Sequence, residues 1–328
     1  MVRENIRFTS AGIIGKMDSG ENVKSYIQKK PEWLRIKLPK AGEYAYLKKY
    51  LAKYNLHTIC ESGLCPNIGE CWNNRTATFM ILGNICTRSC GFCAVETGKP
   101  LPADDEEPIR IAEVIKQMKL NHCVITSVDR DDLPDGGAEL WSQTVMAIKK
   151  YNPETSVETL IPDFKGDNNS IAKIIESRPE IISHNLETVE RLTKHVRIQA
   201  KYKRSLEVLK FISSSGTSTK SGIILGLGES EEEILQTMDD LLKAGCSILT
   251  LGQYLRPTKN HLPVVRYISP HEFEQLKNTA LQKGFKFVES GPLVRSSYHA
   301  EKHIIKKTNS DSFKPLTDLK MPLTDLPH

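Results

Sequence analysis

From residue 78 onward, short runs of β-branched and apolar residues alternate with segments of helical periodicity, and this alternation constrains the fold most. The expected strands are 78–82, 122–127, 156–160, 181–185, 221–225 and 248–252, with a further short one at 286–289. The expected helices start near 109 and 204, span 138–150, 170–177 and 270–283, and follow Ser230, which with Glu233 forms a capping-box pattern. About six βα units in succession predict an α/β fold, a partial (β/α)6 barrel of the TIM type. A doubly wound sheet is the competing fold, but no G-x-G-x-x-G sequence follows the first strand.

Three parts are expected along the chain. Residues 1–75 do not follow the βα alternation and carry the first group of cysteines. Residues 76–290 form the barrel, and residues 291–328 form a C-terminal extension. The end of the chain after 307 is polar and repeats Pro-Leu-Thr-Asp, so we expect a mobile tail.

The composition is that of an ordinary globular protein, because 328 residues with 39 % apolar and 26 % charged side chains allow a sizeable core. A net charge of +5 is too small to indicate nucleic-acid binding. No apolar run reaches the length that spans a bilayer. The N-terminal 26 residues lack the apolar stretch of a signal peptide and include acidic side chains, which disfavours a transit peptide. We therefore expect a cytoplasmic protein with no membrane or nucleic-acid partner.

The cysteines carry the most specific signal, because six of the eight lie between Cys60 and Cys93. A secreted disulfide framework would spread its cysteines through a short chain behind a signal peptide. Clustered thiols in a reducing compartment are more often ligands of a metal or of an iron–sulfur cluster. The two isolated cysteines, Cys123 and Cys246, are expected to be small buried apolar side chains.

Cys86, Cys90 and Cys93 form a C-x3-C-x2-C triplet in the loop after the first expected strand, at the mouth where βα barrels place their chemistry. Three thiolates around a four-iron cluster leave one iron without a protein ligand, and such an open position is what a substrate-binding metal needs. The alternative is a zinc site, which would want a fourth protein ligand.

Cys60, Cys65 and Cys71 form a second triplet, C-x4-C-x5-C. By itself this spacing fits a structural zinc site with His57 as the fourth ligand as well as it fits an iron–sulfur cluster. A second cluster becomes the better interpretation beside the first triplet.

The first triplet, with Phe92 before its last cysteine, resembles that of the radical S-adenosylmethionine (SAM) superfamily. The sequences C-P-N-x-G-E-C-W and G-N-x-C-T-R-x-C-x-F-C together are similar to those of lipoyl synthases in particular. Arg295-Ser296-Ser297-Tyr298 resembles the R-S-S-Y motif of the same family. The resemblance covers about residues 30 to 307 and implies a barrel of the radical SAM type.

The resemblance implies two 4Fe-4S clusters. The one on Cys86, Cys90 and Cys93 would bind SAM, and the auxiliary one would be held by Cys60, Cys65, Cys71 and Ser297. A hydroxyl is a poor match for a soft iron–sulfur centre, so the serine corner should be the easiest to release. Arg295 is expected beside the auxiliary cluster. Thr126, Asp129, Glu158 and Asn185, at or near the carboxyl ends of expected strands, are candidates to bind SAM, although each could equally be a strand-end cap.

The reaction that the resemblance implies is radical removal of hydrogen from carbons 6 and 8 of a protein-bound octanoyl-lysine group. Sulfur from the auxiliary cluster then replaces the hydrogen. The implied partners are octanoylated lipoyl-carrier proteins (the H protein or lipoyl domains), an electron donor such as ferredoxin or flavodoxin, and iron–sulfur carrier proteins. Such carriers are commonly acidic, and the basic run 194–204, expected as a loop, could dock one or be a solvated loop.

Two other classes compete with this interpretation. One is another two-cluster radical SAM enzyme that inserts sulfur, such as a methylthiotransferase, which would usually carry an added RNA-binding domain. The other is a zinc or iron–sulfur binding module without catalytic activity.

Overall fold

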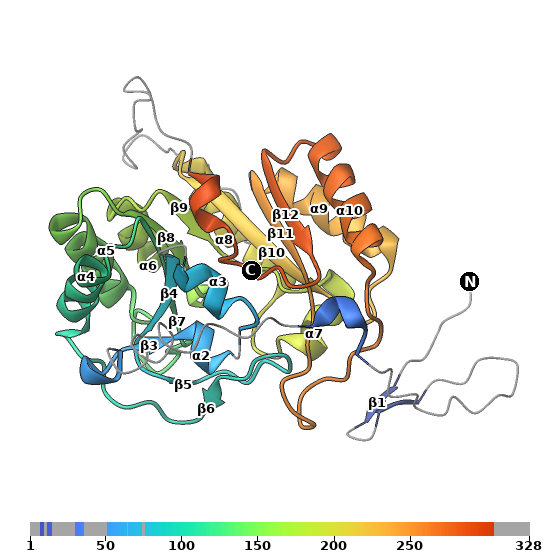
Figure 1. The fold of residues 1–328 in the computed structure, drawn as a ribbon, viewed down its shortest axis with the longest axis horizontal. Helices are drawn as coiled ribbons and strands as arrows, with labels where there is room; N and C mark the ends of the chain where they lie inside the picture. The colour runs from blue at the N-terminus through green and yellow to red at the C-terminus, as the bar shows by residue number, and fades with distance from the viewer. Residues whose placement is uncertain are drawn as a thin grey trace, which may run out of the picture.

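The computed structural model describes residues 7–9, 12–14, 30–35, 51–63, 65–73 and 76–304, and an eight-stranded sheet is its centre (Figure 1). The strand order is β12-β11-β10-β9-β8-β7-β4-β3. The strands are β3 (His57–Thr58), β4 (Thr76–Ile81), β7 (His122–Ser127), β8 (Ser156–Leu160), β9 (Ile181–Ser183), β10 (Ser218–Leu225), β11 (Ile248–Gln253) and β12 (Phe287–Gly291). All neighbours pair in parallel except β3 and β4. The order ends in β12 on one side and β3 on the other, so the sheet is an open, partial barrel, as predicted.

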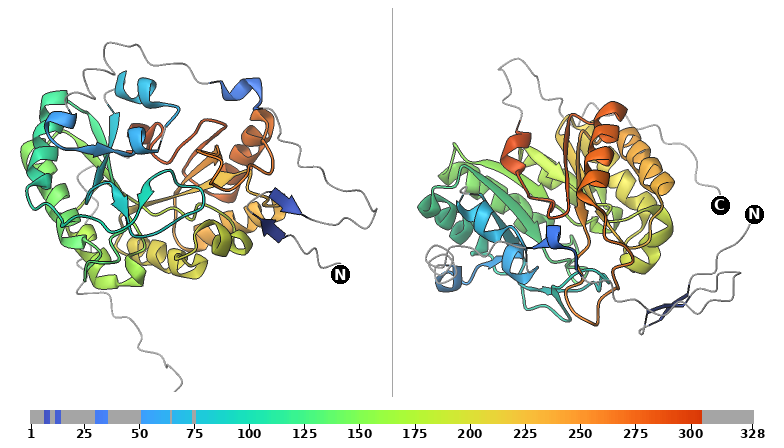
Figure 2. Two further views of the ribbon diagram at one scale, coloured as in Figure 1. Left: turned by 90° about the horizontal axis from the view of Figure 1, so that it is seen from below. Right: turned by 45° about the vertical axis from the view of Figure 1, so that its right-hand side comes forward.

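A helix follows each of the first six parallel strands. These helices are α4 (Glu107–Met118), α5 (Ala138–Tyr151), α6 (Asn168–Glu176), α8 (Tyr202–Ser214), α9 (Glu231–Lys243) and α10 (Pro270–Lys283). They form an arc around the outer face of the curved sheet (Figure 2). The capping box predicted at Ser230 and Glu233 is present and begins α9.

The strands are buried on both faces, which explains why they read as continuous apolar runs. All six residues of β4 and of β11 are buried. One apolar cluster joins β4, β7 and β8 to α4, α5 and α6, and a second joins β10 and β11 to α9 and α10. This packing fixes the carboxyl ends of the strands, where the candidate site lies.

The residues before β4 add two short helices to the barrel, α2 (Ile59–Ser62) and α3 (Ile68–Asn73), and also the edge strand β3. Outside the sheet lie the strand pairs β1 (Arg7–Thr9) with β2 (Gly12–Ile14) and β5 (Ile85–Cys86) with β6 (Glu96–Thr97), and the short helices η1 (Glu32–Leu34) and η2 (Phe164–Gly166). After β12 the chain returns to the barrel and forms η3 (Ala300–His303), whose His303 Nδ1 lies 3.4 Å from Lys220 Nζ. The tail expected to be mobile lies outside the described residues.

The basic run 194–204 is a loop only at residues 197–201, so the prediction of a loop was wrong at both ends of the run. Its first residues end α7 (Glu190–Val196), a helix that the sequence analysis did not predict, and its last residues begin α8. Arg197 is buried, and Arg204 forms an ion pair with Asp163 at 2.6 Å. Three lysines of the run, Lys194, Lys201 and Lys203, are exposed.

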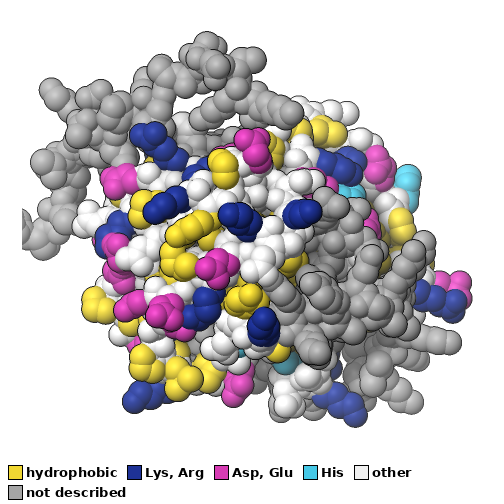
Figure 3. Space-filling model, turned by 60° about the vertical axis from the view of Figure 1, so that its left-hand side comes forward, with side chains coloured by type: hydrophobic (Ala, Val, Ile, Leu, Met, Phe, Trp, Pro, Cys, Tyr) yellow, Lys and Arg dark blue, Asp and Glu magenta, His cyan; other side chains and the backbone are white. Residues whose placement is uncertain are grey.

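Acidic, basic and apolar side chains are interspersed on the face shown in Figure 3. The exposed large apolar side chains on the described part of the chain include Leu101, Ile109 and Met146. Among the described residues, no helix has the length and apolar character that crossing a membrane requires.

Candidate active site

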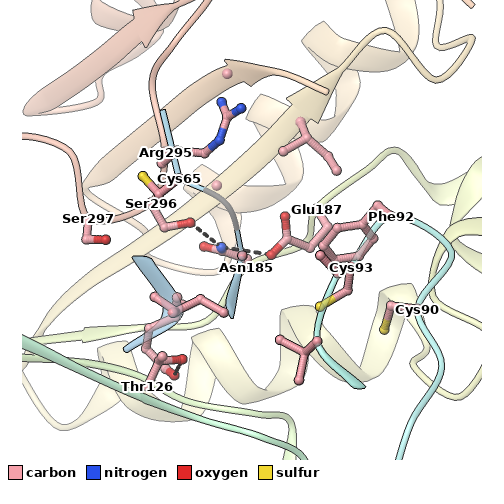
Figure 4. A pocket seen from close by; sticks show the side chains of 18 of the residues that line it. Cys65, Cys90, Phe92, Cys93, Thr126, Asn185, Glu187, Arg295, Ser296 and Ser297 are labelled. Atoms are coloured by element: carbon pink, nitrogen blue, oxygen red, sulfur yellow. Dashed lines mark hydrogen bonds between the residues drawn. The ribbon is translucent and has the colours of Figure 1, made fainter. Parts of the chain in front are cut away.

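A cavity of about 480 Å³ lies at the carboxyl ends of the strands and is lined by cysteines of both triplets. Cys86, Cys90 and Cys93 line it from the loop after β4, and Cys60 and Cys65 line it from the segment before β4. In Figure 4, Cys65 lies beside the 295–297 segment on one side and Cys90 and Cys93 lie on the other, with polar side chains between them. One cavity therefore brings together the two motifs that the sequence analysis treated separately.

The loop that carries the first triplet begins at Leu82, whose backbone is held by two side chains. Leu82 has a φ of +67°, an uncommon conformation for a branched side chain. Its N–H donates to Glu107 Oε2 at 2.8 Å, and its carbonyl accepts from Arg130 Nη1 at 3.2 Å. These bonds stabilise the turn that directs the chain from β4 into the cysteine loop.

Arg88, between the first two cysteines of the loop, is buried among three carboxylates. Its guanidinium donates to both oxygens of Asp131 at 2.7 and 2.8 Å, and Nη1 lies 3.2 Å from Asp129 and 2.9 Å from Asp163. Burial opposes the charge of Arg88, but these carboxylates outweigh burial and raise its pKa. Burial also opposes the charge of Asp163, yet Arg88, His184 and Arg204 lower its pKa to about 2. This network joins the cysteine loop to the ends of β7 and β8.

The first triplet fits an iron–sulfur cluster by the chemistry of its donors. Burial raises the pKa of Cys90 to about 12 and that of Cys93 to about 11, so the thiols need a cation to lose their protons in this place. Backbone N–H groups of Arg88 and Asp129 point at Cys86 Sγ at 3.4 and 3.3 Å, as donors to a thiolate do. None of the eight cysteines forms a disulfide.

The alternative of a single metal ion is not supported for either triplet. Within residues 51–63, 65–73 and 76–304 and the shorter described segments, no three His, Cys, Asp or Glu side chains are arranged to hold one ion, including His57 with the second triplet. A four-iron cluster places each thiolate on a different iron, so its ligands stand farther apart.

The second triplet is held against the C-terminal segment. Burial raises the pKa values of Cys65 and Cys71, and the nearby thiols of Cys65 and Cys60 raise that of Cys71 further. Asn67 Nδ2 donates to the carbonyl of Leu293 at 2.6 Å, across 226 residues of sequence. Cys71 does not line the cavity itself.

Ser297 and Arg295 both line the cavity beside Cys60 and Cys65. Thr78 Oγ1 of β4 donates to Ser297 Oγ at 2.9 Å. Burial lowers the pKa of Arg295, while the nearby Cys65 and Glu187 counteract that effect. The segment comes this close because Gly252 has no side chain, since a Cβ there would overlap the carbonyl oxygen of Val294.

Three of the four side chains that were candidates to bind SAM line the cavity: Thr126, Asp129 and Asn185. Thr126 Oγ1 donates to the carbonyl of Leu160 at 3.0 Å, and Asp129 faces Arg88. Asn185 Oδ1 is buried without a hydrogen-bond partner among the described residues, which fits an acceptor that awaits a ligand donor. These side chains suit the amino and ribose groups of SAM.

Glu158 is placed differently. It does not line the cavity, and its fully buried carboxylate lies 3.0 Å from Lys220 Nζ and accepts from Ser183 Oγ at 2.7 Å. Those two contacts are to Oε1, and Oε2 accepts from the same Lys220 Nζ at 3.1 Å, so both oxygens are bound inside the barrel. This placement does not support a contact between Glu158 and a ligand in the cavity.

Several cavity residues were not singled out from the sequence, notably Glu187, Arg197 and Ser296. Glu187 has a φ of +63°, and burial raises its pKa. Ser296 had a visible signal, because it lies within the R-S-S-Y motif. Glu187 had a weaker one, two residues after Asn185, and its backbone conformation cannot be read from sequence.

The comparisons with known proteins agree with this site. The model of the radical SAM superfamily matches residues 80–241. The chain is 59 % identical over 285 residues to "Lipoyl synthase, mitochondrial" of Nematostella vectensis, covering 87 % of this chain and 98 % of the relative. It is 58 % identical over 276 residues to the lipoyl synthase of Christiangramia forsetii, covering 84 % and 94 %.

Solved structures support the fold alone. Methylornithine synthase aligns with a TM-score of 0.51 at 12 % identity, covering 76 % of this chain and 77 % of that one. SuiB of Streptococcus suis bound to its precursor peptide aligns with a TM-score of 0.51 at 14 % identity, covering 80 % and 57 %. Two cysteine triplets at one barrel mouth, together with these identities over most of its length, place this chain in the lipoyl synthase family, with a radical SAM barrel.

Proposed function

We propose that this chain is a lipoyl synthase that inserts two sulfur atoms, at carbons 6 and 8, into an octanoyl group held on a lysine of a lipoyl-carrier protein. The observation that carries the proposal is the meeting of cysteines from both triplets with Ser297 at one cavity. A sulfur-inserting enzyme with two clusters needs the radical source and the sulfur source within reach of one bound substrate. This arrangement supports that requirement.

In this proposal Cys86, Cys90 and Cys93 hold one 4Fe-4S cluster, and Cys60, Cys65, Cys71 and Ser297 hold the auxiliary one. When bound, the clusters and SAM supply the radical that removes hydrogen and the sulfur that replaces it. Asn185 and Thr126 would position SAM through its polar groups.

The barrel itself would exclude water from the reaction. Apolar side chains such as Met80, Phe92 and Ile223 line the cavity beside the cysteines. A dry wall protects a reactive carbon centre from side reactions and gives the octanoyl chain a place to lie. An electron donor such as ferredoxin or flavodoxin would supply the electrons. Iron–sulfur carrier proteins would rebuild the auxiliary cluster.

The octanoylated carrier would dock at the exposed lysines of the run 194–204. Lys194, Lys201 and Lys203 are exposed, and Arg197 and Ala200 between them line the cavity, so the run borders the site. Reversing the three charges should weaken carrier binding and make it less sensitive to salt. The matched control reverses three exposed lysines that do not line the cavity, Lys116 and Lys119 at the end of α4 and Lys150 in α5, and should leave binding unchanged. If both sets of substitutions weakened carrier binding equally, the carrier would not dock at the run 194–204.

The deciding experiment is anaerobic reconstitution followed by counting of iron and sulfide. Reductant, SAM and an octanoyl-lysine peptide are then added, and mass spectrometry follows the products. We expect about eight irons per chain, as two four-iron clusters require. We also expect the peptide to gain two sulfurs and 5′-deoxyadenosine to form.

Two cysteine variants separate the roles of the triplets. Cys93→Ala should abolish deoxyadenosine formation. Cys71→Ala should retain it and lose sulfur insertion. Cys123→Ala, in the buried core, is the matched control and should keep both clusters. Zinc in place of iron, with no deoxyadenosine, would overturn the proposal.

A further inference from the structure

Three consecutive side chains of segment 295–298 each form a hydrogen bond with a different residue on the body of the protein. The pairs are Ser296 with Asn185, Ser297 with Thr78, and Tyr298 with Glu70. Ser296 and Ser297 are adjacent, yet one reaches the end of β9 and the other reaches β4. A single peptide unit therefore links two walls of the cavity, and Figure 4 shows Ser296 bonded to Asn185.

Asn185 is held in one orientation by its two acceptors. Its Nδ2 donates to Glu187 Oε1 at 2.9 Å and to Ser296 Oγ at 2.5 Å. Because both hydrogen bonds are donated by Asn185 Nδ2, the amide nitrogen faces Glu187 and Ser296, and this fixes the opposite oxygen. That oxygen, Asn185 Oδ1, is the buried acceptor without a partner among the described residues. Ser296 thus helps to aim the acceptor that a ligand would use.

We propose that Ser296 is a positioning residue that couples occupancy of the SAM pocket to the placement of Ser297 beside the second cysteine triplet. The inference rests on the proposed function, in which Asn185 contacts SAM and Ser297 is an auxiliary-cluster ligand. A ligand that donates to Asn185 Oδ1 fixes the Asn185 side chain, which fixes Ser296, and the next residue moves with the same backbone. By linkage, correct placement of Ser297 then favours SAM binding in return.

Other contacts anchor the segment without involving the SAM side of the cavity. Asn67 binds the carbonyl of Leu293, and Tyr298 Oη donates to Glu70 Oε1 at 3.1 Å. Loss of the Ser296 hydroxyl should therefore leave the segment docked. The coupling between SAM binding and the placement of Ser297 should be lost.

The test is hydrogen exchange of residues 291–304 in the protein with both clusters, with and without SAM. SAM should slow exchange of this segment in the unmodified protein. In Ser296→Ala, SAM should still bind, about 5- to 10-fold more weakly for the loss of one hydrogen bond, but should no longer slow exchange. Ser296→Thr keeps the hydroxyl, and SAM should again slow the exchange of the segment in this variant. If the alanine variant is unstable, Ser296→Val has the shape of Ser296→Thr without the hydroxyl, and SAM should no longer slow exchange in it.

Thr78→Val is the matched control, because it removes the other serine contact without touching Asn185. It should speed exchange of the segment both with and without SAM while keeping the SAM-dependent difference. A second measurement is the ratio of deoxyadenosine formed to sulfur inserted, which should rise in Ser296→Ala because radical formation and sulfur delivery are no longer coordinated.

Full SAM-dependent slowing in Ser296→Ala would overturn the inference, and so would its absence in the unmodified protein. Failure of the proposed function looks different. There, the unmodified protein would neither bind SAM nor form deoxyadenosine.

Discussion

Lys220 and Glu158 form an ion pair at 3.0 Å inside the barrel, with both side chains fully buried. They come from β10 and β8, on either side of β9, and His303 of the C-terminal segment lies next to the lysine. Removing one partner of such a pair leaves a buried charge without compensation. The pair therefore belongs to the framework of the barrel and also touches the segment that carries Ser297.

Lys220→Met should lower the free energy of unfolding by about 3–5 kcal/mol, since Glu158 would stay buried and unpaired. Urea denaturation measures this loss. Lys149→Met is the control, because Lys149 and Glu180 pair at 2.6 Å but are 30 % and 35 % exposed, and its loss should stay below about 1 kcal/mol. Similar losses for the two variants would contradict the structural role of the buried pair.

Glu107 should make the stability of the protein fall as the pH rises. Burial raises its pKa to about 7 from an ordinary value near 4.5, so the folded state holds a proton that the unfolded state has lost. Its contribution to the free energy of unfolding is complete below about pH 4.5. That contribution falls by up to about 3 kcal/mol as the pH rises to about 7. Glu107→Gln should flatten this slope, measured by denaturation from pH 4.5 to 8. The exposed Glu106→Gln should not, and an unchanged slope in Glu107→Gln would refute the assignment.

Arg88→Lys should loosen the first cysteine loop, although it keeps the charge. An ammonium group cannot bind Asp131 through two nitrogens and still reach Asp129 and Asp163 as the guanidinium does. We expect faster hydrogen exchange in residues 85–93 of the metal-free protein and loss of up to half of the iron after reconstitution. Arg110→Lys, at a partly exposed pair with Asp104, is the control and should change neither. Normal iron content with unchanged exchange would show that Arg88 does not organise the loop.

Gly252→Ala should displace the segment that carries Ser297, because a Cβ there would overlap the carbonyl oxygen of Val294. Iron should fall from about eight to about four per chain, the content of one cluster. Deoxyadenosine should still form while sulfur insertion stops. Gly98→Ala is the control, since its Cβ would meet only an ordinary contact at 3.5 Å with Ile85. Loss of deoxyadenosine in Gly252→Ala would mean that the two sites cannot be separated in this way.

The sequence by itself determined the barrel and the spacing of the cysteines that are candidate ligands. Periodicity predicted the strands at 122–127 and 156–160 and the helix at 270–283 with the bounds that the structure has, because local apolar patterns and caps specify these elements. The spacing of Cys86, Cys90 and Cys93 predicted a cluster loop, since three thiolates within eight residues can surround one small group.

Only the tertiary structure decided which distant side chains meet. It placed Glu158 in an ion pair with Lys220, 62 residues later, away from the cavity that the sequence analysis expected it to line. It also extended α7 into the first residues of the expected loop and brought Ser296 to Asn185 across 111 residues. Local patterns cannot encode such pairings, because they depend on the curvature of the whole sheet and on where the chain returns after β12. Local sequence patterns thus determined the elements and the candidate ligands, and the curvature of the whole sheet determined the geometry between them.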